Sequence, residues 1–257
     1  RGVLWMALSN GISNVNLNST FTLLDADMGL TTTVFATYRF DGTLYFSTNN
    51  GIFYLDEEQG EVKAIPGTYG QGGNFLDYKN RLYISTNGMG LIEIKGTSFS
   101  LVRPNVNYDF RGRFIYQSDL DPNRVFIDHQ QGFKSFYFDE KTKQFQEESS
   151  TDKIILGSGS IIELEDGSLL MDTTSDGEVV KIIPAYLDGK LDLETSEFKY
   201  YGPADGLPDA GLGINDSFGE IIVNSPDAKQ TYTFNKETDR FEEKTFFFDE
   251  YSDWDNP

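Results

Sequence analysis

Tyrosine and arginine side chains occur together in two segments that are rich in glycine, asparagine and proline. Tyr69 lies in the segment PGTYGQGGN, and Tyr108, Arg111 and Arg113 lie in the segment RPNVNYDFRGR. A tyrosine offers a flat apolar face with a polar tip, and an arginine offers a rigid two-pronged donor for a carboxylate or sulfate. We therefore predict that these four residues form a site for a small molecule, and that the arginines favour an anionic or sugar-acid group.

Two asparagines in the same segments, Asn74 and Asn107, are predicted to be hydrogen-bonding neighbours in this site. The arginines have an alternative explanation, because the chain holds 41 acidic residues with which they can form salt bridges.

Residue types that support covalent or metal chemistry are scarce. His129 is the single histidine, which excludes a metal site built from several imidazoles, and a polar turn is the simpler explanation for it. The chain has no cysteine, so disulfides, thiol catalysis and zinc-thiolate sites are excluded. We predict no catalytic residue, metal or cofactor in this chain. A pair of carboxylates that cleaves a glycosidic bond remains an alternative, because acidic residues are so numerous in this chain.

Charge and composition limit the class of partner. The 21 lysines and arginines against 41 acids give a net charge of −20, which repels nucleic acids and anionic membrane surfaces. A hydrophobic content of 38% is typical of a folded domain, and no stretch is apolar enough for a spanning helix. Because the chain begins inside a repeat, we expect it to be a segment of a longer protein with its membrane anchor elsewhere.

A short sequence motif, called here the repeat phrase, recurs along the whole chain. It indicates which strands and turns must position the site. Its turn residues are spaced about 40 to 50 residues apart, which is typical of repeat architectures. They are Gly2, Gly42, Asn80, Asn123, Gly167 and Gly219. Each unit reads as four short strands rich in tyrosine, phenylalanine, valine and isoleucine, separated by hairpin turn signals such as Asp-Gly. Helices are hard to place anywhere.

Repeated four-stranded units must pack face to face around an axis to bury both sheet faces. The sequence therefore predicts one all-β domain over 1–257, a β-propeller of four-stranded antiparallel blades with six detectable repeats, from a larger propeller region in the parent protein. A β-sandwich is the alternative, but its strands would have no reason to repeat in fours. Strand-centre aromatics such as Tyr45, Tyr83 and Phe126 are predicted to form the core between blades.

Two kinds of loop lie on the same face of a propeller. One joins the fourth strand of a blade to the first strand of the next blade, and the other joins the second and third strands within a blade. The inter-blade loops are long, so we predict the ligand site on this face. These loops are 25–33, 66–74, 103–113, 149–160 and 202–215.

Two units depart from the pattern. The unit near Gly167 carries about ten extra residues around PAYLDGKLDLETS, predicted to extend the hairpin between its third and fourth strands. The unit near Gly2 lacks a first strand, which either the C-terminal TFFFDEYS or sequence outside this chain could supply. Part of the aromatic run Phe246, Phe247 and Phe248 is predicted to be buried.

The phrase Gly-x-Leu-Trp-x-x-x-x-x-Gly-Ile at Gly2 to Ile12, echoed at Gly42 to Ile52, resembles the two-component regulator propeller repeat. Stretches at 116–133, 200–209 and 231–247 are similar to later parts of the same repeat. The tryptophan of the motif is present at Trp5, with other apolar residues in its place in later units. These are Tyr45, Tyr83, Phe126, Leu170 and Ile222.

The resemblance implies a periplasmic or extracytoplasmic sensor domain of a membrane-anchored bacterial transducer, a hybrid histidine kinase or a regulator with a triple-tyrosine module. It further implies signal transduction by binding of a small molecule or oligosaccharide, with a homodimer as a further expectation and the kinase outside this chain. The alternatives are a propeller glycosidase or polysaccharide lyase with paired carboxylates, and a fragment that only packs against other propeller units.

Overall fold

The computed structural model describes residues 3–8, 11–16, 24–106, 110–129, 132–154, 156–173, 178–209, 212–217, 219–225 and 230–244. For 3–8, 11–16, 110–113, 129 and 156–159 it describes the backbone alone.

Five four-stranded antiparallel sheets, the blades, make up most of the described chain. Blade 1 contains β3 (Val34–Phe40), β4 (Thr43–Thr48), β5 (Gly51–Asp56) and β6 (Glu61–Ala64). Blade 2 contains β7 (Gly72–Asp77), β8 (Leu82–Thr86), β9 (Gly90–Lys95) and β10 (Ser98–Pro104). Blade 3 contains β11 (Phe110–Gln117), β12 (Arg124–His129), β13 (Gly132–Asp139) and β14 (Gln144–Thr151).

The remaining elements follow the same order. Blade 4 contains β15 (Leu156–Glu163), β16 (Leu169–Thr173), β17 (Val179–Leu187) and β18 (Lys190–Tyr201). Blade 5 contains β19 (Gly213–Ser217), β20 (Glu220–Ser225), β21 (Gln230–Asn235) and β22 (Arg240–Glu243). Two 3-10 turns, η1 (Ala26–Met28) and η2 (Pro203–Asp205), precede blades 1 and 5. In the described residues no helix is long and apolar enough to cross a membrane.

The prediction of six repeats is wrong, because the unit near Gly2 does not form a blade. Its described residues form a separate two-stranded sheet of β1 (Val3–Leu8) and β2 (Gly11–Asn16), in which Trp5 is opposite Asn14. The recurring sequence motif corresponds to the second and third strands of a blade. In the unit near Gly2 these two strands pair with each other, without a first or fourth strand among the described residues. The run Phe246 to Phe248, part of which is predicted to be buried, lies outside the described residues.

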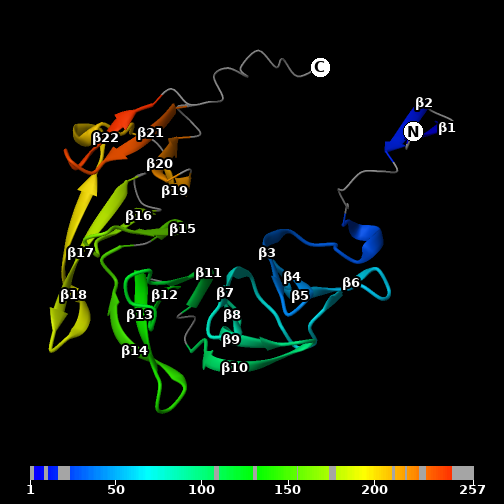
Figure 1. Cartoon of the computed structure of the whole chain (residues 1–257), viewed down its shortest axis with the longest axis horizontal. Coiled ribbons are helices and arrows are strands. Elements are labelled where there is room, and N and C mark those ends of the chain that lie inside the picture. The colour runs from blue at the N-terminus through cyan, green and yellow to red at the C-terminus, as the bar shows by residue number, and fades with distance from the viewer. Residues whose placement is uncertain are drawn as a thin grey trace.

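The first strand of each blade is its innermost strand. β3 contacts β7, β7 contacts β11, β11 contacts β15, and β15 contacts β19. Within the described ranges no comparable contact joins β19 back to β3, and Figure 1 shows the five blades in an open arc. The predicted all-β propeller with four-stranded blades is confirmed, with five blades.

Tight turns join the first two strands of blades 1 and 2, as the turn residues predict. Asp41 and Gly42 have φ angles of 46° and 81°, and Lys79 and Asn80 have φ angles of 52° and 58°. Two successive positive φ angles match the twist of a two-residue hairpin, a conformation that glycine and asparagine adopt at low cost.

Four hydrophobic clusters form the core, and each lies between two neighbouring blades. Tyr45 of blade 1 shares a cluster with Phe75 of blade 2, and Tyr83 of blade 2 shares one with Ile115 of blade 3. The later clusters join blade 3 to blade 4 and blade 4 to blade 5. The residues at the tryptophan position of the repeat in these blades are all buried, which confirms the predicted inter-blade core. They are Tyr45, Tyr83, Phe126, Leu170 and Ile222.

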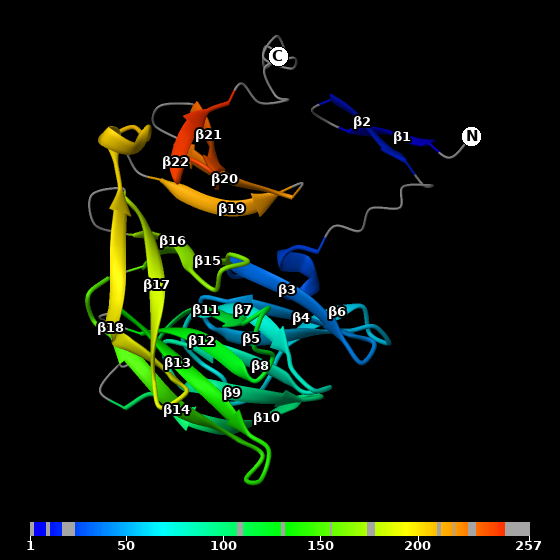
Figure 2. The ribbon, with the colours of Figure 1, turned by 60° about the vertical axis from the view of Figure 1, so that its left-hand side comes forward.

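The extended hairpin predicted for the unit near Gly167 is formed by β17 and β18. It turns at Asp188 and Gly189, with φ angles of 51° and 77°, and reaches along the outer strand β14 of blade 3 (Figure 2). Leu191 N donates to Glu148 Oε1 at 3.0 Å, and Leu193 N donates to Ser149 Oγ at 2.8 Å. We call this hairpin the arm of blade 4.

Candidate functional site

Tyr69 lies on the face that carries the inter-blade loops, as predicted. Its side chain is 59% exposed, and its ring lies over Gly88 in the turn between β8 and β9. A Cβ atom at Gly88 would come within 2.7 Å of the tyrosine ring, so the absence of a side chain there makes room for Tyr69. The tyrosine therefore stands on a turn of blade 2 with much of its surface open to solvent.

Hydrogen bonds hold this loop against that turn. Gln71 N donates to Asn87 Oδ1 at 2.8 Å, and Asn87 N donates to Gln71 O at 2.9 Å. The two kinds of loop thus meet on one face, which the propeller geometry led us to expect. At this point the inter-blade loop is hydrogen-bonded to the turn of blade 2.

Arg111 and Arg113 lie in the innermost strand of blade 3, where only the backbone is described. In this stretch β11 departs from regular pairing with β12, between Phe110 opposite His129 and Ile115 opposite Ile127. Such irregularities re-aim side chains at the rims of sheets. The inner strands β3, β7 and β15 contain similar register shifts. Asn107 and Tyr108 lie outside the described residues.

Asn74 joins two blades through its side chain. Its Nδ2 donates to Ile115 O at 2.7 Å, and Ile115 N donates to its Oδ1 at 2.8 Å. The carboxamide therefore pairs β7 with β11 as a backbone amide would. A carboxamide has one further N–H and further lone pairs, so Asn74 keeps some capacity for a ligand.

A cavity of about 250 Å³ lies among the innermost strands of blades 2 to 5. Its polar lining includes Asn74, Ser160, Asn215 and Asp216, and its apolar lining comes from blades 3 and 4. We call it the axial cavity. Of the predicted site residues whose side chains are described, Tyr69 and Asn74, Asn74 is found in its lining. Sequence reasoning did not single out Ser160 and Asn215, although both end loops that it marked as functional.

Tyr116 forms one wall of the axial cavity. Its hydroxyl donates to Asp119 Oδ2 at 2.7 Å, and its ring stacks on Phe126 with the ring centroids 6.3 Å apart. Burial raises the pKa of Tyr116, and the hydrogen bond to Asp119 raises it further. The phenol therefore stays neutral at physiological pH and contributes an uncharged wall.

The described residues contain no group of three or more histidine, cysteine, aspartate or glutamate side chains placed to hold a metal ion. His129 ends β12, where its backbone pairs with Phe110 and Gly132. The sequence predicted a turn position for His129. The structure places it at the end of a strand, directly before the turn from β12 to β13 and on the same face as Tyr69.

An open arc of four-stranded blades around an axial cavity defines a β-propeller. No family model matches the sequence, and no curated protein matches it. Among solved structures, the catalytically inactive H270A virginiamycin B lyase of Staphylococcus aureus, determined with quinupristin, matches with a TM-score of 0.57 and 15% identity. That match covers 95% of this chain and 80% of the lyase.

Two further matches come from B. thetaiotaomicron and are described as extracellular domains of hybrid two-component systems. BT3049 has a TM-score of 0.58 and 18% identity over 86% of this chain, and BT4673 has a TM-score of 0.52 and 12% identity over 82% of this chain. The chain spans 31% and 30% of their lengths. At these identities the likeness establishes the propeller fold and no more.

Proposed function

We propose that this chain is an extracytoplasmic sensor propeller of a membrane-bound two-component signal transducer, and that it binds a small solute or glycan fragment. The repeat phrase at Gly42 to Ile52 supports this proposal, and so does the fold shared with the extracellular domains of BT3049 and BT4673. The parent protein is proposed to be membrane-anchored and dimeric, with its kinase or other output domain outside this chain.

The axial cavity is the observation that carries the binding proposal. Its lining comes from the inner strands of four successive blades, so one small ligand would contact all four. A ligand that prefers one arrangement of the blades shifts the population toward it, which is the physical requirement for a sensor. The ligand would lie on the axis and reach the loop face, where Tyr69, Arg111 and Arg113 would extend the site, with Asn107 and Tyr108 completing the predicted set.

A glycan panel tests this function when the melting temperature and the product are both measured. A ligand at 100 times its dissociation constant stabilises the folded protein by about 2.7 kcal/mol, so binding appears as a clear rise in the melting temperature. Ser160→Leu should fill part of the axial cavity and abolish that rise, whereas Ser98→Leu on the exposed outer strand β10 should keep it. A panel ligand that stabilises both variants equally would place the binding site elsewhere.

The loop-face residues have their own test. Arg113→Ala should weaken an anionic panel ligand by about 1.5 to 3 kcal/mol while leaving folding largely intact. A sharp fall in melting temperature at unchanged affinity would instead identify Arg113 as a structural partner of a carboxylate.

The second candidate is a propeller enzyme, a lyase or glycosidase, and the fold shared with virginiamycin B lyase favours it. An enzyme would consume panel ligands and release products such as new reducing ends. We expect no product from the wild-type chain. Product formation that is lost in His129→Ala, or in a variant of the axial carboxylate Asp216→Asn, would establish the enzyme instead of the sensor.

A further inference from the structure

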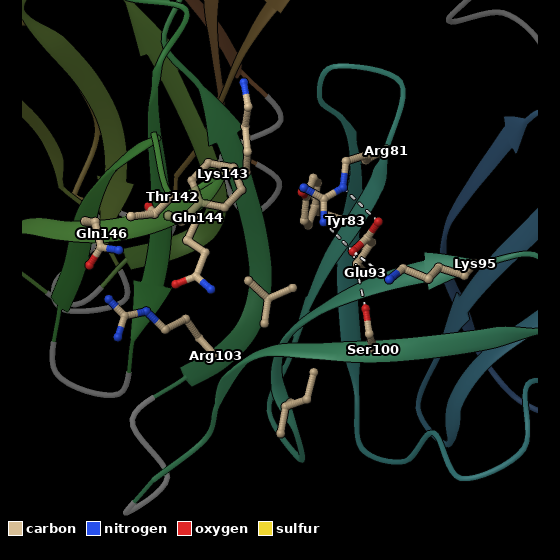
Figure 3. Close-up of a pocket in the computed structure, with 13 residues that line it drawn as sticks. Arg81, Tyr83, Glu93, Lys95, Ser100, Arg103, Thr142, Lys143, Gln144 and Gln146 are labelled. Carbon is tan, nitrogen blue, oxygen red and sulfur yellow. Dashed lines mark hydrogen bonds and ion pairs between the residues drawn. The ribbon is translucent and has the colours of Figure 1, made fainter. Parts of the chain in front are cut away.

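A second cavity, of about 330 Å³, lies away from the axis, between blades 2 and 3 (Figure 3). Strands β8, β9 and β10 of blade 2 form one wall. The turn from β13 to β14 and the first residues of β14 in blade 3 form the other. We call it the inter-blade pocket. It shares no lining residue with the axial cavity.

The charge of the inter-blade pocket is opposite to that of the protein. Arg81, Lys95, Arg103 and Lys143 line it, with Glu93 as the carboxylate among its lining residues. The chain as a whole has 41 acids and 21 lysines and arginines. Cations that gather in so acidic a chain are expected to be paired with the protein's own carboxylates, and three of these four are.

Glu93 holds two of the cations in place. Arg81 donates to it through Nε at 2.8 Å and through a terminal nitrogen at 2.6 Å, and Lys95 Nζ lies 3.4 Å away. The hydrogen bonds from Arg81 lower the pKa of Glu93 and keep it ionised. Lys143 pairs with Glu140 at 2.7 Å outside the pocket lining. These groups form a fixed wall with a surplus of positive charge.

Arg103 differs from the other three cations because it has no partner. Within the described part of the chain its side chain makes no ion pair or hydrogen bond, and its Nε is buried with no acceptor. A bulge in β10 between Leu101 and Arg103 sets its direction, and its guanidinium lies 5.5 Å from the ring centre of Phe136 in blade 3. Stacking on the ring holds the guanidinium plane while leaving its donors unused.

Two carboxamides lie beside the unpaired guanidinium. Figure 3 shows Arg103 extending toward the side chains of Gln144 and Gln146, across the pocket from Arg81, Glu93 and Lys95. Neither glutamine side chain has a hydrogen-bond partner within the described residues. Together they offer donors and acceptors for hydroxyl groups next to a donor fork for an oxyanion.

We propose that the inter-blade pocket binds a small hydroxyl-bearing oxyanion, a carboxylate or sulfate, with Arg103 as its two-pronged donor and Gln144 and Gln146 as hydroxyl partners. A bound oxyanion would accept hydrogen bonds from the two terminal nitrogens of Arg103 and would balance the surplus positive charge. A long polyanion does not fit, because the net charge of −20 on the whole chain repels it. This site is independent of ligand binding at the axis.

Calorimetric titration at constant ionic strength tests the proposal with sodium glucuronate, sodium sulfate, sodium phosphate and glucose as probes. Glucuronate should bind the wild-type chain about tenfold or more tightly than glucose, since glucose lacks the charge-assisted bonds. Sulfate and phosphate carry an oxyanion without sugar hydroxyl groups. Binding as tight as that of glucuronate would mean that the pocket recognises the oxyanion alone, and weaker binding would mean that it also recognises the hydroxyl groups. Equal binding of glucuronate and glucose, or no binding of any anion, would overturn the proposal.

Single substitutions test whether glucuronate binds in the inter-blade pocket. Arg103→Gln should weaken glucuronate about tenfold to a hundredfold. Arg39→Gln, the same change at an exposed arginine of blade 1, should leave affinity unchanged. Glucuronate should also shift the side-chain amide resonances of Gln144 and Gln146 in the wild-type protein, a measurement that needs no variant to fold. Unshifted amides, or full affinity in Arg103→Gln, would show that the pocket is not the site.

Discussion

The interface between blades 2 and 3 and the interface between blades 3 and 4 use an arginine in opposite ways. Arg103 in the first is unpaired beside an open pocket. Arg124 in the second donates from Nε to Glu148 Oε2 at 2.8 Å and pairs with Asp121 at 3.2 Å. Its side chain is 8% exposed, and that of Glu148 is 4% exposed.

The hairpin between the third and fourth strands explains the difference. In blade 3 this hairpin has a four-residue turn that borders the pocket beside β10. In blade 4 the corresponding hairpin is the arm, which covers β14 and brings Tyr186 to 5.8 Å from the Arg124 guanidinium. The arm also donates Leu191 N to Glu148, so that the carboxylate is enclosed. Hairpin length therefore decides whether an inter-blade groove is filled by protein or left open for a ligand.

The largest expected effect comes from breaking the closed interface at its charge pair. Arg124→Ala leaves Glu148 buried without its cation, which should lower the free energy of unfolding by about 3 to 5 kcal/mol. Urea unfolding followed by tyrosine and tryptophan fluorescence measures the loss. The account of this interface fails if Arg124→Ala costs no more than the same change at Arg103.

Removing an apolar anchor of the arm should have the next largest effect. Leu193 is 0% exposed and packs in the cluster shared by blades 3 and 4. Leu193→Ala should lower the free energy of unfolding by about 2 to 4 kcal/mol through lost burial and the cavity left behind. The exposed Leu187 near the tip of the arm is the matched control, and Leu187→Ala should change stability by less than about 0.5 kcal/mol. Equal effects would mean that the arm does not pack as described.

A smaller, pH-dependent effect is expected at the interface between blades 4 and 5. Burial opposes ionisation of Asp239, but hydrogen bonds from Lys199, Tyr201 and Lys181 lower its pKa to about 2. Since the folded pKa lies below the ordinary value of 3.8, this carboxylate stabilises the fold above about pH 4, and the contribution is lost as the pH falls toward 2. The carboxylate is 36% exposed, so water screens the interaction and keeps the effect modest.

Asp239→Asn should therefore make the unfolding free energy fall less steeply than in the wild type between about pH 4 and pH 2. Glu165→Gln is the control, because that side chain is 96% exposed and should leave the slope unchanged. Parallel curves for wild type and Asp239→Asn would show that Asp239 does not fasten blade 5 to blade 4.

The smallest expected effect on stability is at the open interface. Arg103 makes no ion pair in the described chain, so Arg103→Ala should change the unfolding free energy by less than about 1 kcal/mol, mostly through lost stacking on Phe136. Thermal unfolding without any anion measures this. A loss comparable to that of Arg124→Ala would make Arg103 a structural residue and would remove the contrast between the two interfaces.

Local chemistry explains which parts of the fold could be predicted from the sequence. Turn pairs such as Asp41-Gly42 and Asp188-Gly189 act within a few residues, so they located the hairpins and the extended arm correctly. The hairpin of β1 and β2 carries the same local signals, and therefore the repeat phrase alone could not reveal that this hairpin forms a two-stranded sheet, and not a blade, in the described residues.

The sites depend on contacts that the local pattern does not contain. Arg103 stood inside a segment read as a loop, whereas a bulge places it in β10 against a ring of the next blade. Asn74 was predicted to face a ligand and lines the axial cavity, but its bridge to Ile115 depends on how blades 2 and 3 pack. Both facts require knowledge of which strands of different blades come together.

Each core cluster connects a blade only to its immediate neighbours, and this has a consequence for how the chain unfolds. The stability of such an assembly is close to a sum over single units and their shared boundaries, as in linear repeat proteins. Blade 1 shares one cluster, with blade 2, while blade 3 shares clusters on both sides. Unfolding is therefore expected to begin at an end of the arc and to advance one boundary at a time, so that amide hydrogens in β4 exchange earlier than those in β12.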